Sequence, residues 1–105
     1  MPSPITNIQA EELLKTCVEP RVTEESIKQK IVFVDYLYHL TTTICVITMG
    51  NGFKFIGTST PAASANYRME LGQKYAYDNA FKQIWTHEGY LLRENLSKSE
   101  GLENV

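Results

Sequence analysis

Residues 31–60 have the sequence IVFVDYLYHLTTTICVITMGNGFKFIGTST. β-Branched and aromatic side chains dominate residues 31–38 and 43–49, where the pattern changes to the period of two that is typical of strands. The Gly-Asn-Gly of residues 50–52 tolerates positive φ angles, so it predicts a tight hairpin between the second and third strands. A turn at residues 39–42 joins the first two strands. The segment therefore predicts a three-stranded antiparallel meander.

The third strand is predicted to have two chemically different faces, because successive side chains of a strand point to opposite sides. One face has Phe53, Phe55, Gly57 and Ser59, and the other has Lys54, Ile56, Thr58 and Thr60. One face of the sheet therefore carries a pair of aromatic rings.

Two helices are predicted before the strands. Asn7 can cap a helix that extends to about residue 18, and its apolar positions follow the spacing of an amphipathic helix: Ala10, Leu13, Leu14, Cys17 and Val18. This stripe is expected to bury against another surface. Thr23 can cap a second, shorter helix, with Glu24 and Glu25 at its positive end and Ile27 facing inward.

After the strands, a long helix is predicted from a cap at Ser64 or Asn66 to about Trp85. A new, short helix is expected to begin at residues 86–88 and to be anchored by Tyr90, Leu91 and Leu92. A stripe of small residues would let the long helix approach the sheet or another helix closely: Gly72, Ala76 and Ala80. The fold class is therefore α+β, with a small antiparallel sheet, N-terminal helices, one long helix and a short C-terminal helix.

Length and charge limit the possible partners. The 105 residues favour one domain, and residues 1–6 and 98–105 are expected to be flexible. A net charge of −2 argues against long nucleic acid as a partner. No apolar run is as long as a membrane span and no secretory signal is recognisable, so a cytoplasmic location is expected.

The sequence contains no recognisable catalytic set, metal site or cofactor motif. Cys17 and Cys45 are interpreted as small buried apolar residues, because they lack metal-ligand spacing. His39 and His87 lie in separate elements, and neither belongs to a nucleophile motif. We therefore predict no catalytic residue, no metal and no cofactor, and expect the chain to act by binding.

A group of residues between positions 22 and 96 resembles a family of short phage and prophage proteins. The most specific part is the ending IW..EGYLLRE, residues 84–94, preceded by Asn51-Gly52-Phe53, Gly57 and a helical set: Asn66, Gly72, Lys74, Ala76, Asn79 and Ala80. This family includes the Thoeris anti-defence sponges, which sequester cyclic ADP-ribose isomers without cleaving them.

The resemblance implies a small-molecule cyclic nucleotide as ligand. Some relatives are also thought to hold cyclic oligonucleotides at a separate site. The resemblance further implies a homodimer or a higher homo-oligomer such as a hexamer, and a location in the cytoplasm of the infected bacterium.

The resemblance also implies ligand-binding residues. Phe53 matches the aromatic residue that stacks on adenine, Thr60 lies where a polar contact is expected, and Arg93 matches an arginine that grips pyrophosphate. Tyr77 stands where other members have an arginine, and a tyrosine cannot form a bidentate phosphate contact. Lys74 is a candidate to compensate for that missing cation.

Other interpretations remain open from the residues alone. The aromatic residues could be core or interface residues instead of stacking surfaces, and Lys74 could belong to a solvated ion-pair ladder with Asp78 and Lys82. The chain could be a phage accessory protein that binds a host protein through its helices. An enzyme that degrades the signal is a third possibility.

Overall fold

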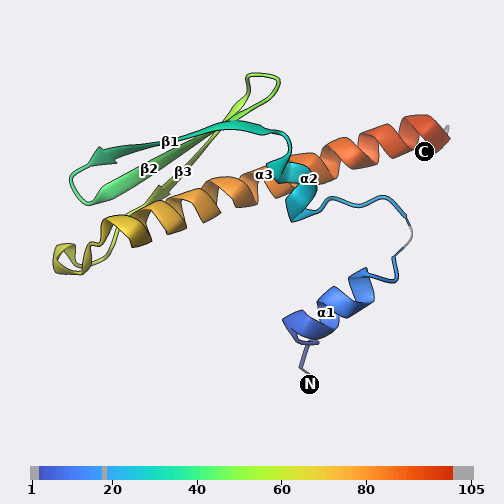
Figure 1. Ribbon diagram of the computed structural model, residues 1–105, viewed down its shortest axis with the longest axis horizontal. Coiled ribbons are helices and arrows are strands. Elements are labelled where there is room, and N and C mark those ends of the chain that lie inside the picture. The colour runs from blue at the N-terminus through green and yellow to red at the C-terminus, as the bar shows by residue number, and fades with distance from the viewer. Residues whose placement is uncertain (1–2, 18, 101–105) are drawn as a thin grey trace.

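A computed structural model describes residues 3–17 and 19–100 of the chain. The described elements confirm the predicted α+β class, with a three-stranded sheet on one side of a long helix (Figure 1). In chain order they are α1 (Asn7–Leu14), α2 (Glu24–Lys28), β1 (Ile31–His39), β2 (Thr42–Met49), β3 (Lys54–Ser59), η1 (Ser64–Asn66) and α3 (Met69–Glu100).

The sheet is the predicted antiparallel meander with strand order β1-β2-β3. Val46 in the central strand lies opposite Asp35 on one side and Ile56 on the other. Gly52 has a φ of 90°, and its N–H donates to the Met49 carbonyl at 2.9 Å. The positive φ explains why glycine suits this position of the hairpin.

Helix α3 packs on the inner face of the sheet through its small residues, as predicted. Ala76 and Ala80 are fully buried, and a Cβ added to Gly57 would meet the backbone of both. A Cβ added to Gly72 would meet Thr43. This close approach builds the apolar core of the described chain: Ile27, Cys45, Ile47, Met49, Phe55, Ala76, Ala80, Phe81 and Ile84.

The predicted break in the helix near residues 86–88 is wrong, because α3 continues without interruption from Met69 to Glu100. The chain has no proline in this range, and a helical glycine such as Gly89 costs only about 1 kcal/mol relative to alanine. The residues interpreted as a new helix start are accommodated within the helix. Residues 101–105 and 1–2 lie outside the described part, so the flexibility of both chain ends remains a prediction.

Helix α1 differs from its prediction in both bounds and burial. Thr6 caps it in place of Asn7, through a reciprocal pair of hydrogen bonds with Gln9. The helix ends at Leu14, and the Thr16 hydroxyl donates to the Leu13 carbonyl at 2.6 Å, a local contact that competes with helical pairing. Val18, the last member of the predicted stripe, lies outside the described residues.

The expected burial of the α1 stripe is also wrong for the single chain. None of the residues of α1 is buried, and Cys17 is exposed, whereas Cys45 is buried as predicted. Figure 1 shows the reason: α1 lies apart from the sheet and from α3. The second helix agrees with its prediction, because Thr23 caps α2, both glutamates lie in its first turn and Ile27 is fully buried.

Leu40 in the β1–β2 turn has a φ of 54°, a conformation that is unfavourable for a residue with a β-carbon. We expect Leu40→Gly to raise the free energy of unfolding by about 1 kcal/mol, because the exposed leucine side chain contributes little packing there. Urea denaturation of the two proteins measures the difference. A lower free energy of unfolding for the variant would contradict this explanation.

Candidate functional site

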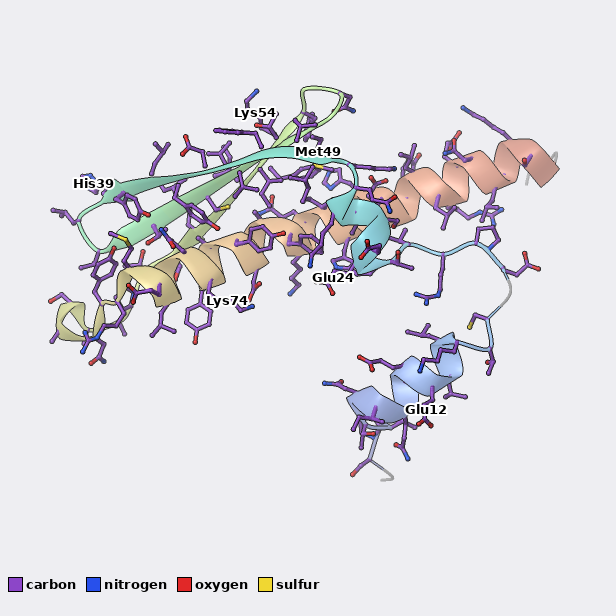
Figure 2. All side chains as sticks on the ribbon, viewed as in Figure 1. Glu12, Glu24, His39, Met49, Lys54 and Lys74 are labelled. Atoms are coloured by element: carbon purple, nitrogen blue, oxygen red, sulfur yellow. The ribbon has the colours of Figure 1, made fainter. Side chains whose placement is uncertain are left out.

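A pocket of about 400 Å³ lies between the β2–β3 hairpin and α3. Its volume is in the range of small-molecule sites. Three separate parts of the chain form its lining: the segment from α2 into β1, the hairpin, and the middle of α3. The lining residues are Gln29, Lys30, Val32, Met49, Gly50, Asn51, Phe53, Phe55, Ile84, His87, Glu88 and Leu91. In Figure 2, Met49 and Lys54 mark the hairpin end of the sheet where this pocket lies.

Aromatic rings form one wall of this hairpin pocket. The Phe55 ring lies edge-on to both Phe53 and His87, with ring centroids 5.1 Å apart in each pair. Phe55 is buried, whereas Phe53 remains 57% exposed. The Asn51 side chain accepts a hydrogen bond from the Phe53 N–H at 2.9 Å, which fixes the backbone at the hairpin. The exposed Phe53 ring can therefore offer a face to a planar ligand.

One ion pair and one histidine supply the polar groups of the hairpin pocket. Lys30 Nζ lies 2.9 and 3.0 Å from the two carboxylate oxygens of Glu88, whose side chain is only 13% exposed. His87 Nδ1 is 2.9 Å from the Gln83 carbonyl. Because a carbonyl only accepts hydrogen bonds, Nδ1 carries the proton and Nε2 of a neutral ring remains an acceptor. The pocket thus combines an apolar wall with a cation, an anion and an acceptor.

Only Phe53 of the five predicted ligand residues lines the hairpin pocket. Thr60 lies beyond the opposite end of β3, about 20 Å away at the usual rise of a strand. Its hydroxyl shares a 2.7 Å hydrogen bond with Thr42, and it lines a second pocket of about 250 Å³ together with Arg68 and Tyr75. Phe53 and Thr60 of one chain therefore cannot contact the same small ligand.

The other three predicted residues lie along α3. Lys74, labelled in Figure 2, lies near the start of α3. It forms a 2.6 Å ion pair with Asp78, and the hydrogen bond from the lysine to this carboxylate raises the pKa of the lysine. This pair agrees with the alternative interpretation, in which Lys74 and Asp78 belong to a row of solvated ion pairs along the helix. Tyr77 is half-buried with its ring centroid 5.6 Å from that of Phe81, and burial raises the pKa of its hydroxyl. Arg93 is exposed on the part of α3 beyond the pocket.

Sequence reasoning did not identify Lys30, His87 and Glu88 as members of the site. Lys30 lies before the first strand, and the adjacent His87 and Glu88 lie on α3, so all three are far from Phe53 along the chain. No local spacing pattern connects them. The paired aromatics on one strand face were the available signal, since any residue of a helix packed on that face becomes a neighbour of Phe53 and Phe55. The alignment of α3 along β3 places His87 beside Phe55, and this alignment could not be predicted from the sequence.

The described residues hold no group of three or more His, Cys, Asp or Glu side chains arranged to bind a metal ion. Over the same ranges, no helix is long and apolar enough to cross a membrane.

Residues 18–96 match the model of a family described as "Phage protein (N4 Gp49/phage Sf6 gene 66) family". No curated protein and no solved structure matches the chain.

Proposed function

Because the chain belongs to the phage protein (N4 Gp49/phage Sf6 gene 66) family, we propose that it is a phage-encoded anti-defence protein that sequesters a cyclic nucleotide signal. The ligand would be a cyclic ADP-ribose isomer, with cyclic oligonucleotides as a further possibility. The chain would hold this signal without cleaving it and thereby block Thoeris-type signalling in the cytoplasm of the host.

The observation that carries the proposal is the exposed Phe53 ring at the mouth of an apolar pocket. Stacking of a base on an aromatic ring contributes about 1–3 kcal/mol. The ring is positioned by the hairpin and supported edge-on by Phe55, so little order is lost when a base binds. A rigid aromatic wall of this kind suits capture of a planar heterocycle.

Lys30 is the one lysine or arginine among the described residues that line the hairpin pocket. It is half-exposed and reaches the pocket as part of its pair with Glu88. A bound phosphate would compete with Glu88 for this ammonium group, which is a compact donor with rotatable N–H groups. Thr60, Lys74, Tyr77 and Arg93 would take part in this site only if another copy of the chain presented them.

Isothermal titration with cyclic ADP-ribose isomers and a panel of cyclic di- and trinucleotides tests the proposal. We expect one of these ligands to bind, and denaturation followed by chromatography to return it unchanged. If the chain binds no ligand of the panel, the proposal that it sequesters a cyclic nucleotide is refuted. Recovery of a cleaved product would instead indicate an enzyme.

We expect Phe53→Ala to weaken ligand binding by roughly 5- to 150-fold, because the base loses its stacking surface. The free energy of unfolding should change by no more than about 0.5 kcal/mol, since the ring is largely exposed. Tyr90→Ala is the matched control, because Tyr90 is an exposed aromatic residue that does not line the hairpin pocket. Equal affinities for the two variants would remove Phe53 from the site.

A further inference from the structure

Helix α1 is folded, but none of its residues is buried against the described part of the chain. A helix of eight residues is marginal in water without tertiary contacts, even with the capping box that Thr6 and Gln9 provide. Four large apolar side chains on or next to α1 are exposed to solvent: Ile5, Ile8, Leu13 and Leu14. We call α1 with these residues the arm. Its composition requires a partner surface.

The outer face of the sheet carries a second group of exposed apolar side chains that no described element covers. Helix α3 covers the inner face, whereas Phe33, Leu37 and Ile56 on the outer face are 60%, 52% and 55% exposed. Ile44 lies opposite Leu37, and Val46 lies opposite Ile56, so an apolar stripe crosses the three strands. Polar residues border the stripe, and Asp35 separates Phe33 from Leu37 along β1. The water-facing side of an antiparallel sheet normally carries polar residues, so this stripe is unusual for a face without a covering element. We call this surface the open face.

The dimensions of the chain also indicate missing contacts. Its Cα radius of gyration is 17.6 Å, whereas a compact domain of this length has about 13 Å. In Figure 1 the arm lies on the side of α3 away from the sheet. One chain thus carries an unpartnered helix and an unpartnered sheet face, which are surfaces that pack on each other in two-layer folds.

We propose that two copies of this chain exchange their arms, so that each arm covers the open face of the partner. The segment between Leu14 and Glu24 can extend over about 30 Å, which gives the arm the reach to leave its own body. Its own open face lies behind both α3 and the sheet, whereas a partner's face can approach the arm directly. A twofold pair forms the contact twice, which doubles the buried area.

The exchange is independent of the proposed ligand, because neither the arm nor the open face lines the hairpin pocket. It is tested by complementation between two variants in sedimentation experiments. The arm variant carries Ile8→Ser and Leu13→Ser, and the face variant carries Phe33→Ser and Leu37→Ser. All four side chains are more than half exposed, so both variants should retain the wild-type circular dichroism spectrum.

We expect the wild-type chain to sediment as a dimer or larger species, and each variant alone to sediment as a monomer at the same concentration. An equal mixture should recover a heterodimer, because the arm of the face variant can still dock on the intact face of the arm variant. Leu40→Asn serves as the control, since it removes a large apolar side chain that is 85% exposed and belongs to neither surface. It should sediment like the wild type.

A mixture that remains monomeric would overturn the exchange and favour contacts of arm with arm or of face with face. A wild-type chain that sediments as a monomer would also overturn the exchange. The arm would then be expected to bind a host protein instead of a second copy of the chain. Retained association of either variant alone would show that the surface it lacks is not needed.

Discussion

Gly57→Ala is expected to lower the free energy of unfolding by about 3 kcal/mol or more, at the upper end of the cost of overpacking. The added Cβ would overlap the backbone of Ala76 and Ala80, and it would lie 2.9 Å from the Ala80 Cα. Flexible side chains can move aside, but here the obstacle is the main chain of α3. The helix would have to separate from β3.

Hydrogen bonds on both sides of Gly57 oppose that separation. The Gln83 side chain donates to the Ile56 carbonyl at 2.8 Å, and the Thr58 N–H donates to the Asn79 side chain at 3.1 Å. Shifting α3 would break these bonds and open the core at Ala76 and Ala80. The cost therefore combines steric strain with lost hydrogen bonds and lost packing.

Gly89→Ala is the matched control, because it makes the same chemical change on α3, the helix that faces Gly57 of β3. A Cβ at Gly89 meets no atom within 4 Å, so the variant should gain about 1 kcal/mol from the higher helix propensity of alanine. Urea denaturation measures both variants. Effects of the same sign and similar size would show that the contact between Gly57 and α3 is not as close as described.

The sequence was informative at several places where a local rule determines the structure. The Gly-Asn-Gly turn predicted the β2–β3 hairpin, and Thr23 predicted the start of α2. The small-residue spacing on α3 predicted a close approach to the sheet or to another helix, although it did not identify the sheet as the partner or Gly57 as the contact on β3. These features depend on neighbouring residues, which is why one sequence was enough.

The errors arose where local signals were weak or where long-range contacts determine the length of a helix or the burial of its residues. Thr86 and Glu88 have the chemistry of a helix start, but α3 continues through them. The apolar spacing of α1 was recognised correctly, yet burial was expected without a surface in the chain to provide it. Periodicity shows that a residue is suited to a contact and does not identify the partner.

The same limit applies to the site. The position of Phe53 at the hairpin follows from local features, whereas its role as a ligand residue was implied by the family resemblance and remains a prediction. The Lys30–Glu88 pair was missed because it depends on how α3 is aligned along β3, and the five predicted residues do not meet within one chain. Identifying a pocket requires this alignment, which a single sequence does not contain.

Ile84→Ala is expected to lower the free energy of unfolding by about 2–5 kcal/mol, because it removes a fully buried side chain from a core with little capacity to collapse. Ile84 also lines the hairpin pocket, so its loss enlarges the cavity beneath Phe53 and Phe55. Leu71→Ala on the same helix is the control, since Leu71 is about half exposed and its loss should cost little. A cost below about 1 kcal/mol for Ile84→Ala would contradict its place in the core.

Ligand binding separates the two roles of Ile84. A ligand that binds only the folded chain raises the free energy of unfolding by RT ln(1 + [L]/Kd), so thermal unfolding with and without ligand reports affinity and stability together. Phe53→Ala should reduce the ligand-dependent shift and leave the unliganded midpoint nearly unchanged. Ile84→Ala should lower the unliganded midpoint and also reduce the shift, because the same side chain supports the core and the pocket wall. A full ligand-dependent shift in Ile84→Ala would place the bound ligand away from the hairpin pocket.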